Sequence, residues 1–375
     1  MLAQGFSAPH DARSSVGYSF TLPQESRHES QLAGKTAGPT NSLDIWRIKG
    51  EDIGVPELIG IARLAAQSSQ LEAKRRVEYF DLPARSYVTK CASERVPFDW
   101  TINPYRGCEF GCKYCYARYA HEFMELRDPQ DFERKIFVKH FDAARFREEL
   151  RHISSGESIA IGTATDPYQP AERRYRITRA MLEVFANLAG FRLGITTKSN
   201  LITRDIDLLR EIARRHYLRI SMTVTTVDTE LARLLEPLAP RPDLRLRAVR
   251  TLSAAGFRVT LSCSPILPLI NDTEPSIDAV ARAAARAGAR GIWGNVLFLK
   301  PCAREVFMPF LEQRFPLLVR RYRERFERSA YLRGEYPKLI QERVTQICRR
   351  YGLDRKDPQP EPELWPKTAQ LSLFS

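Results

Sequence analysis

Short apolar runs rich in β-branched and aromatic residues recur through the middle of the chain and alternate with helical stretches. In the helical stretches 171–189, 203–215 and 275–288, apolar residues recur at the three- and four-residue spacing of an amphipathic helix. Strands that alternate with helices in this way indicate βα units and a parallel sheet. Six runs fit the strands: FDWTIN (98–103), SIAIGTA (158–164), RLGITTK (192–198), LRISMTV (218–224), FRVTLSC (257–263) and WGNVLFL (293–299).

Six βα units predict an α/β fold, namely an incomplete (β/α)6 barrel of the TIM type that spans residues 95–302. The run KIFVKH (135–140) is predicted to form a further strand inside an insertion. In barrels of this kind the chemistry lies on loops at the carboxyl ends of the strands. The polar motifs of this sequence follow, or end, the predicted strands, so we expect them to converge on one face.

The segments on either side of the predicted barrel differ from it in composition. Residues 1–45 are rich in Ser, Gly, Pro, His and Gln without a sustained apolar period, which predicts a disordered tail. Residues 46–94 form an N-terminal extension, with a helix over 56–76 that packs on the barrel. Residues 303–352 are predicted to form two C-terminal helices, and the Pro- and charge-rich 353–375 an extended tail.

The overall composition is that of a soluble globular protein, with 43% hydrophobic and 27% charged residues. A run of 18 or more apolar residues, as a membrane span requires, is absent from the sequence. The first residues lack the charged and apolar regions of a secretory signal, so we expect a cytoplasmic protein without a membrane partner.

The net charge of +13 leaves two interpretations open. A basic excess is typical of proteins that bind nucleic acid or another polyanion. The same excess arises when basic residues simply cover the surface of a protein from an arginine-rich proteome. The arginines are spread through the chain and do not form one tail, so the sequence does not choose between the two.

The stretch GCEFGCKYCY (107–116), here called the cysteine loop, holds Cys108, Cys112 and Cys115 in a CxxxCxxC spacing. Gly107 and Gly111 allow the backbone to wrap tightly around a bulky group. An iron–sulfur cubane normally takes four thiolates, so three predict a [4Fe–4S] cluster with one iron left open for another ligand.

Two other interpretations of the cysteine loop remain. A structural zinc ion takes four ligands, so a zinc knuckle would need His121 or a distant cysteine to complete it. The three thiols would otherwise be buried and inert. The remaining cysteines stand alone in the sequence: Cys91, Cys263, Cys302 and Cys348.

The cysteine motif, with Tyr114 before its last cysteine, resembles the signature of radical S-adenosylmethionine (radical SAM) enzymes. NPYRGCEFGCKYCYAR, together with GTATDPYQPAE, TTKSNLITRDIDLL, TVTTVDTELARLLEP and SPILPLIND, is similar to the spore photoproduct lyase-like group, also called DNA repair photolyase-like. The resemblance covers roughly residues 95–310. It implies that Cys108, Cys112 and Cys115 ligate a [4Fe–4S] cluster, and that the methionine part of S-adenosylmethionine chelates the open iron.

The resemblance also implies an activity. Reductive cleavage of S-adenosylmethionine would give a 5′-deoxyadenosyl radical that abstracts hydrogen from a substrate, with damaged DNA as the narrower candidate. An external reductant such as flavodoxin or ferredoxin would be a partner. The alternatives from other classes are a nucleic-acid-binding protein with a structural metal knuckle and an iron–sulfur protein that carries electrons or senses redox state.

By resemblance, several residues would contact S-adenosylmethionine. The Tyr114 main chain would lie near the adenine, and Thr163, Thr165 and Asp166 near the methionine amino group. Asp166 also suits an N-cap or an Asx-turn before Pro167. Lys198 would pair with the methionine carboxylate, although a lysine at a strand end can also extend its ammonium to the surface.

The later strands supply the remaining candidates. Alternation along the fourth strand places Ser221 and Thr223 on one face, which we expect to point into the barrel, either against the cofactor or as polar filling of a barrel layer. Pro265 would flank the adenine. Cys263 and Cys302, at or after strand ends, are candidate hydrogen-atom donors that face the same cavity, although a free cysteine is most often a small buried hydrophobe.

Overall fold

The structure, a computed structural model, describes residues 58–366 except 75, 94–95 and 355–357. The chain divides into two units, one of residues 1–57 and 93–97 and one of residues 58–92 and 98–375. All helices and strands given below belong to the second unit. The predicted disordered segment 1–45 lies outside the described residues.

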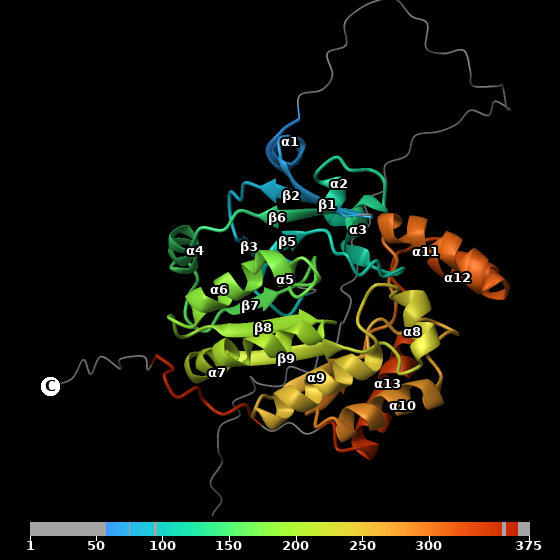
Figure 1. Cartoon of the computed structure of the whole chain (residues 1–375). Coiled ribbons are helices and arrows are strands. Elements are labelled where there is room, and N and C mark those ends of the chain that lie inside the picture. Colours follow the sequence, from blue (N-terminus) through green and yellow to red (C-terminus); the bar gives the residue numbers. More distant parts are fainter. Residues whose placement is uncertain (1–57, 75, 94–95, 355–357, 367–375) are drawn as a thin grey trace, which may run out of the picture. The chain divides into compact units, whose positions relative to one another are not determined.

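A seven-stranded sheet with the order β11-β10-β9-β8-β7-β4-β3 forms the main body of this unit (Figure 1). All neighbours from β4 to β11 are parallel, and β3 (Val88–Lys90) pairs antiparallel with β4 at the edge. The predicted α/β architecture with an incomplete six-unit barrel is therefore confirmed. The parallel strands are β4 (Trp100–Ile102), β7 (Ser158–Ile161), β8 (Arg192–Thr197), β9 (Tyr217–Thr223), β10 (Val259–Ser262) and β11 (Gly291–Trp293).

Helices pack on the outer face of this sheet through the largest hydrophobic cluster of the described chain (Figure 1). Buried residues of this cluster alternate along the strands, as in Ile220 and Met222 of β9, and recur on one face of each helix. The helices with members in this cluster are α4 (Ala143–Leu150), α6 (Ile177–Phe185), α7 (Ile206–Arg215), α9 (Pro242–Ala254), α10 (Glu274–Arg286) and α13 (Glu335–Arg350).

A smaller four-stranded sheet, with the order β1-β2-β6-β5, carries the residues that lead into the cysteine loop (Figure 1). The strand predicted over 135–140 is confirmed as β6 (Lys135–Lys139). The helix predicted over 56–76 is wrong in its second half, because Gln70–Lys74 forms β1 and pairs antiparallel with β2 (Val77–Leu82). Only α1 (Gly60–Ala66) remains helical, and β5 (Tyr105–Arg106) completes the sheet.

Two further expectations differ from the structure. The helical stretch 171–189 is broken at Arg176, whose left-handed φ of 54° separates α5 (Glu172–Tyr175) from α6. The last strand was predicted over 293–299, but the regular strand in this region ends at Trp293. Within the rest of the predicted range, Val296 forms an isolated bridge with Ile266. The remaining elements are η1 (Tyr116–Arg118), α2 (Tyr119–Glu122), α3 (Asp131–Arg134), η2 (Asn200–Asp205) and α8 (Thr229–Leu235).

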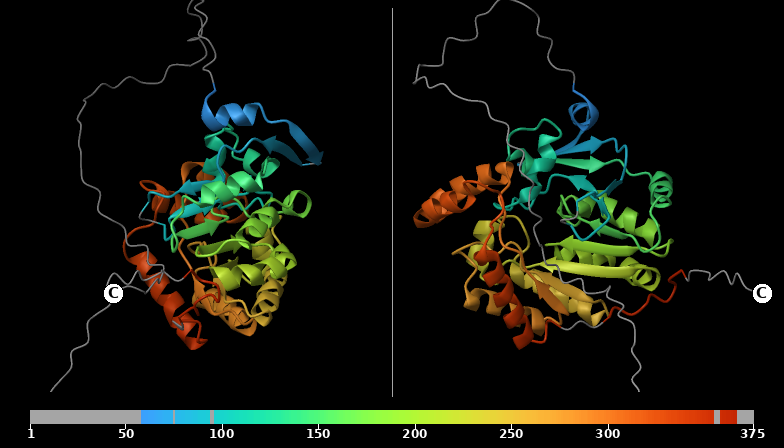
Figure 2. Two further views of the ribbon diagram at one scale, coloured as in Figure 1. Left: turned by 90° about the vertical axis from the view of Figure 1, so that its left-hand side faces the viewer. Right: turned by 180° about the vertical axis from the view of Figure 1, so that it is seen from behind.

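The C-terminal region contains more helices than the two predicted. They are α11 (Pro301–Arg314), η3 (Pro316–Leu318), α12 (Val319–Phe326) and α13, which lies beside α10 and β11 (Figure 2). Part of the predicted extended tail is docked, because Glu363 pairs with Arg214 at 2.8 Å and Trp365 packs edge-on against Tyr217.

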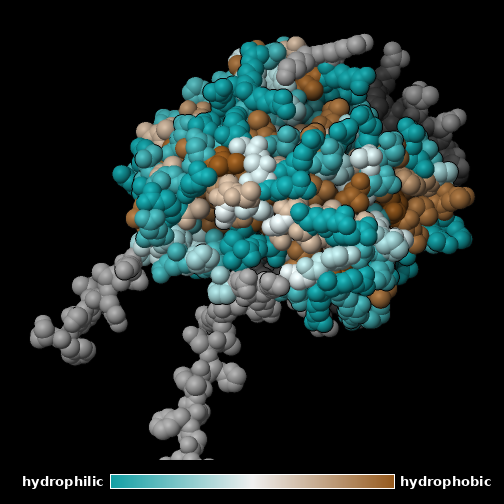
Figure 3. Space-filling model, turned by 60° about the horizontal axis from the view of Figure 1, so that its bottom comes forward, coloured by the Kyte–Doolittle hydropathy of each residue, from teal (hydrophilic) through white to brown (hydrophobic). Residues whose placement is uncertain are grey.

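The surface seen from below is mainly hydrophilic with scattered apolar patches (Figure 3). Three of the large exposed apolar side chains, Leu238, Leu269 and Leu317, lie in turns or in the short helix η3. Among the described residues, no helix has both the length and the apolar character needed to cross a membrane.

Candidate active site

The cysteine loop connects β5 to η1 and follows the carboxyl end of β4. Gly107 and Gly111 have positive φ angles of 84° and 60°. A Cβ atom at Gly107 would lie only 2.8 Å from the backbone oxygens of Phe132 and Lys135. A larger residue at position 107 would therefore clash with backbone, which is why this turn requires glycine.

Cys108 and Cys112 are buried, Cys115 is half-buried, and all three are free thiols. Burial raises the pKa of Cys112 to about 12 and that of Cys108 well above its ordinary value; both shifts also include the charges of other cysteines in the loop. The pKa of Cys115 is raised by burial and lowered in part by Arg118. Buried thiols of this kind become thiolates when a cation binds them.

The alternative of a single metal ion at the cysteine loop can be compared with the geometry. Among the described residues, no three His, Cys, Asp or Glu side chains are grouped closely enough to hold one metal ion. The thiolates of a cubane each bind a different iron, so they surround a volume and do not meet at one point. His121, the proposed completion of a zinc knuckle, instead donates Nε2–H to the Lys135 carbonyl at 3.0 Å, and burial lowers its pKa to about 4.

Buried polar side chains fasten the cysteine loop to the segment after β7. Thr165 donates its hydroxyl to the Gly107 carbonyl at 2.6 Å, and Gln169 donates to the same carbonyl at 3.1 Å. The Glu109 backbone N–H donates to Gln169 at 3.0 Å, while Tyr79 donates its hydroxyl to the Glu109 carboxylate at 2.8 Å. The Thr165 side chain thus positions the loop, and sequence reasoning missed Glu109 and Gln169.

Asp166 joins the segment after β7 to the end of β8. Its carboxylate accepts hydrogen bonds from the Thr197 hydroxyl at 2.7 Å, the Lys198 backbone N–H at 2.7 Å and the Tyr168 backbone N–H at 2.9 Å. The bond to Tyr168 is the Asx-turn that the sequence left as an alternative. Burial raises the Asp166 pKa, and these hydrogen bonds oppose the shift.

Lys198 places an ammonium group next to the cysteine loop. Its Nζ lies 5.8 Å from the centre of the Tyr114 ring and forms no hydrogen bond or ion pair with any described residue. Burial alone would lower the Lys198 pKa, but the neighbouring Cys112 and Glu236 outweigh this effect and the pKa is raised. The structure therefore brings the predicted Lys198 to the cysteines as a charged group with capacity for a ligand.

A buried ion pair beneath Tyr114 was not anticipated. Glu236 accepts hydrogen bonds from the Tyr114 and Thr225 hydroxyls and pairs with Arg245 at 2.5 Å. Both charged side chains are almost fully buried. A signal was present in the sequence, because Arg245 occupies the apolar stripe of α9 that continues through Ala248 and Leu252.

The side chain of Thr163 is engaged within the barrel. Its hydroxyl shares a short hydrogen bond with that of Thr101 and accepts one from the Asn103 amide at 3.2 Å. The Thr163 carbonyl accepts a hydrogen bond from Tyr116, which directly follows the last cysteine of the loop. Thr163 therefore connects β4, the segment after β7 and η1.

The candidates on the later strands lie as alternation predicts. Ser221 and Thr223 are buried and point away from the outer hydrophobic cluster that contains Ile220 and Met222. The Trp293 indole donates to the Ser221 hydroxyl at 3.3 Å. Pro265 follows a cis peptide bond with Ser264 and is half-buried, just after β10.

Cys263 and Cys302 have different surroundings. The Cys263 thiol lies 3.8 Å from the Thr225 carbonyl. Burial, together with the charge of Cys348, raises the pKa of Cys263 to about 12. Cys302, at the start of α11, lines a cavity of about 210 Å³ together with Glu122 of α2. Burial and Glu122 raise its pKa to about 11.

An aromatic row links the cysteine loop to the segment after β11. The Tyr116 and Phe298 ring centres are 5.1 Å apart, and Phe298 stacks on Tyr331 at 5.2 Å. On the other side, Tyr116 stacks on Tyr119 at 6.4 Å, and Lys300 places Nζ 4.0 Å from the centre of the Tyr119 ring. These contacts join the loops of the first and last barrel strands.

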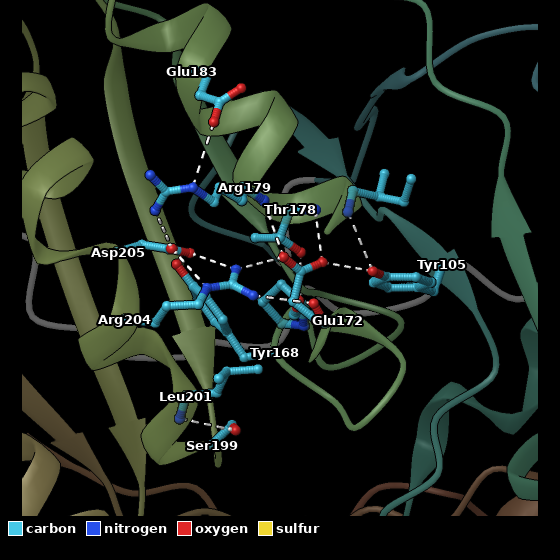
Figure 4. Close-up of polar contacts among 12 residues, drawn as sticks. Tyr105, Tyr168, Glu172, Thr178, Arg179, Glu183, Ser199, Leu201, Arg204 and Asp205 are labelled. Atoms are coloured by element: carbon cyan, nitrogen blue, oxygen red, sulfur yellow. Dashed lines mark hydrogen bonds and ion pairs between the residues drawn. The ribbon is translucent and has the colours of Figure 1, made fainter. Parts of the chain in front are cut away.

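A second buried network surrounds Glu172 and includes Tyr105, two residues before the cysteine loop (Figure 4). Glu172 accepts from the Tyr105 hydroxyl at 2.5 Å and from the Thr178 and Arg179 backbone N–H groups at the start of α6. Arg204 donates to the Glu172 carboxylate at 2.7 Å. Glu172 thus caps the start of α6 across the break at Arg176.

The partial barrel and the cysteine loop define a radical SAM protein. The chain belongs to the Radical SAM superfamily, whose family model matches residues 102–291. Members of this superfamily use a [4Fe–4S] cluster and S-adenosylmethionine, and the buried free thiols with the unpaired Lys198 ammonium beside them fit these two groups.

Similar proteins extend the match beyond the family domain. An uncharacterized protein of Mycobacterium tuberculosis is 36% identical over 282 residues, which cover 74% of this chain and 83% of that protein. An uncharacterized protein of Methanocaldococcus jannaschii is 27% identical over 247 residues, covering 66% and 83%. A structure of spore photoproduct lyase complexed with dinucleoside spore photoproduct aligns with a TM-score of 0.56 at 14% identity, over 80% of this chain and 84% of that one, which is a likeness of fold.

Proposed function

We propose that Cys108, Cys112 and Cys115 hold the [4Fe–4S] cluster and that the protein generates a 5′-deoxyadenosyl radical for hydrogen abstraction from a substrate. The observation that carries this proposal is the trio of free thiols beside the Lys198 ammonium, which acts on Cys112 and forms no hydrogen bond or ion pair with a described residue. Reductive cleavage of the sulfonium is the chemistry that the bound cluster and cofactor supply.

The protein groups bind and orient S-adenosylmethionine. Lys198 pairs with the methionine carboxylate, because a half-buried ammonium without a protein partner is matched by an anionic ligand. The Thr165 and Asp166 side chains are occupied within the protein. Thr165 and Asp166 would therefore fix the position of the segment that holds the methionine amino group.

The later strands and the cysteine loop would hold the adenosine part. The Tyr114 main chain and Pro265 would flank the adenine, and Ser221 and Thr223 would contribute from β9. Glu236 holds Tyr114 through its hydroxyl, and Arg245 fixes Glu236 in turn. These last two are positioning residues, since they act on the cofactor through Tyr114.

The proposal is tested by anaerobic reconstitution and reduction of the full chain. The electron paramagnetic resonance spectrum of the reduced protein should shift when S-adenosylmethionine is added, and 5′-deoxyadenosine should form. Cys112→Ala should abolish both signals, whereas Cys348→Ala, a buried thiol on α13, should keep them. A wild-type preparation with full iron content that shows neither signal would overturn the proposal.

A narrower function, action on a lesion in nucleic acid, is supported by the net charge of +13 and by the likeness of fold to spore photoproduct lyase. The affinity for single-stranded and duplex DNA should then fall steeply as the salt concentration rises, because Lys and Arg side chains that contact phosphates displace the cations bound around the DNA. Absent or salt-independent binding would remove this narrower function and leave the radical chemistry in place.

A further inference from the structure

Arg106 and Lys139 share one face of the smaller sheet. In the antiparallel pair β5·β6, Arg106 lies opposite Phe137 and Tyr105 lies opposite Val138. Lys139 is two residues beyond Phe137, so alternation puts it on the Arg106 face, at the diagonal position within reach of long side chains. The Arg106 charge acts on Lys139 accordingly.

Both cations lack a carboxylate partner among the described residues. Lys139 is only 8% exposed, and its ammonium contacts only the Ser86 carbonyl, at 3.5 Å, within the described part of the chain. Arg106 is half-buried, and its Nε–H is shielded from solvent without a hydrogen-bond partner. Buried charges are normally paired, so two adjacent cations in this state indicate an anion from outside the chain.

The carboxylate that acts on Lys139, Glu149, is occupied elsewhere. It accepts hydrogen bonds from the Tyr87 N–H at 2.8 Å, the Ser86 hydroxyl at 2.9 Å and the Val88 N–H at 3.2 Å. Its other oxygen faces Arg145 at 3.5 Å. With these bonds in place, Glu149 does not serve as the counter-ion, and burial with the Arg106 charge lowers the Lys139 pKa to about 8.

The two cations lie at the catalytic edge of the barrel. The Lys139 backbone N–H donates to the Pro104 carbonyl at 3.4 Å, two residues after β4 ends, and Arg106 precedes Cys108 by two positions. Tyr119, the ring that Lys300 covers, also acts electrostatically on Arg106. A ligand held here would therefore border both the cysteine loop and the aromatic row.

We propose that Arg106 and Lys139 bind a phosphate group carried by the substrate, next to the cysteine loop. A guanidinium fork beside an ammonium suits the several oxygens of a phosphate ester. The inference rests on the proposed function in one respect, namely that the same loop holds the radical source. It specifies the substrate class as a phosphate ester with its reacting carbon on the barrel side of this site.

The test uses reconstituted full-length protein without reductant, so that binding is measured in the absence of turnover. Calorimetry would compare inorganic phosphate, a nucleoside 5′-monophosphate, the same nucleoside without phosphate, and a single-stranded oligonucleotide. Lys139→Gln should weaken the phosphate-bearing probes at least ten-fold. Lys135→Gln, on the same strand but paired with Asp131, should leave them unchanged.

Each outcome decides the inference. If Lys139→Gln weakens the binding of free phosphate or of the mononucleotide, the site takes a terminal phosphate. If it weakens the binding of the oligonucleotide alone, the site takes an internal phosphodiester. Both outcomes support the site. Equal binding of nucleoside and nucleotide, or no response to Lys139→Gln, overturns it. Arg106→Lys keeps the positive charge but not the planar guanidinium, so its affinity for the phosphate-bearing probes should fall less than that of Lys139→Gln. The iron content of the Arg106→Lys protein should equal that of the wild type.

The two proposals fail separately. Formation of 5′-deoxyadenosine without added substrate reports only on the radical source, and it is measured on the wild-type protein. A protein that makes 5′-deoxyadenosine but ignores phosphate contradicts this inference alone. A protein that binds phosphate through Lys139 but makes no 5′-deoxyadenosine contradicts the radical chemistry alone.

Discussion

Two buried ionic networks in the same barrel differ in whether their charges are matched. Around Glu172, the carboxylates of Glu172 and Asp205 meet the guanidinium groups of Arg204 and Arg179 (Figure 4). Arg204 bonds to both carboxylates, and the Tyr105 hydroxyl and backbone N–H groups occupy the remaining oxygen positions of Glu172. The Glu172 network is closed within the protein.

The network beside the cysteine loop is open. Glu236 and Arg245 form a matched pair, but the nearby Lys198 ammonium has no partner among the described residues. Asp166, the other carboxylate that acts on Lys198, gives its oxygens to the Thr197 hydroxyl and to backbone N–H groups. The comparison indicates that a matched network supports the fold, whereas an unmatched charge in a similar setting marks a place for a ligand.

The largest effect is expected from Glu172→Gln in the closed network. Removing the charge of one member of a buried, hydrogen-bonded set leaves Arg204 with Asp205 as its only carboxylate among the described residues, so the free energy of unfolding should fall by about 3–5 kcal/mol. Urea titration with circular dichroism measures this loss. The folded fraction should still take up iron.

Glu183→Gln is the matched control, because Glu183 also pairs with Arg179 at 3.4 Å but its side chain is 55% exposed. An exposed pair contributes at most about 1 kcal/mol, so this variant should unfold nearly as the wild type does. Equal losses from Glu172→Gln and Glu183→Gln would contradict the view that burial makes the Glu172 network structural.

The next largest effect is expected from Lys198→Met in the open network. The affinity for S-adenosylmethionine should fall at least about 30-fold, corresponding to about 2 kcal/mol, because a charged partner of the methionine carboxylate is lost. The free energy of unfolding should fall less than in Glu172→Gln, because Lys198 forms no hydrogen bond or ion pair with a described residue. Calorimetric titration of the reconstituted protein measures the affinity.

Lys198→Arg should recover part of the affinity, because it keeps the charge but changes the donor geometry. If Lys198→Met instead destabilised the fold as Glu172→Gln does and left the affinity intact, Lys198 would belong with the structural charges.

The sequence predicted the barrel because each βα unit is a local pattern. It could not predict that Gln70–Lys74 forms a strand and not the second half of a helix, because the strand depends on pairing with β2. The tendency of a residue to form a strand depends strongly on the neighbouring strand against which it packs. The left-handed break at Arg176 was likewise hidden, because the Glu172 side chain that caps α6 acts across the turn.

At the candidate site, the cysteine motif is contiguous and could be read directly, as could Lys198 at a strand end. Glu236 and Arg245 required knowledge of which helical face is buried, because an arginine on an apolar stripe becomes meaningful only with its partner in view. Arg106 and Lys139 come from different strands, and their shared face follows only from the register of β5 and β6.

A smaller effect is expected at Thr165, which precedes Asp166 of the open network and fastens the cysteine loop. Thr165→Val keeps the shape but removes the hydroxyl shared by Gly107 and Gln169, so it should lower the free energy of unfolding by about 1–3 kcal/mol and shorten the lifetime of the bound cluster in air. The decay of visible absorbance measures that lifetime. Thr165→Ser retains the hydroxyl and should behave as the wild type, and a wild-type lifetime in Thr165→Val would exclude this role.

The smallest effect concerns two neutral histidines, one in each region. Burial lowers the pKa of His121, near the cysteine loop, and that of His216, in the barrel wall, to about 4 each. A lowered folded-state pKa means that the unfolded chain takes up the proton first, at its ordinary value of about 6.5. Stability is therefore complete above that pH and declines as the pH falls below it, toward 4.

Between pH 7 and pH 5.5, each histidine should reduce the free energy of unfolding by about 1 kcal/mol, measured by urea titration at the two pH values. His216→Gln can keep both partners, the Phe185 carbonyl and the Phe191 N–H, without a titrating group. It should remove about half of the pH dependence while His121 supplies the rest. If the free energy of unfolding of His216→Gln depended on pH as strongly as that of the wild type, His216 would not contribute to the pH dependence. The pKa of His216 in the folded protein would then lie close to its ordinary value, and burial in the barrel wall would not disfavour its charged form.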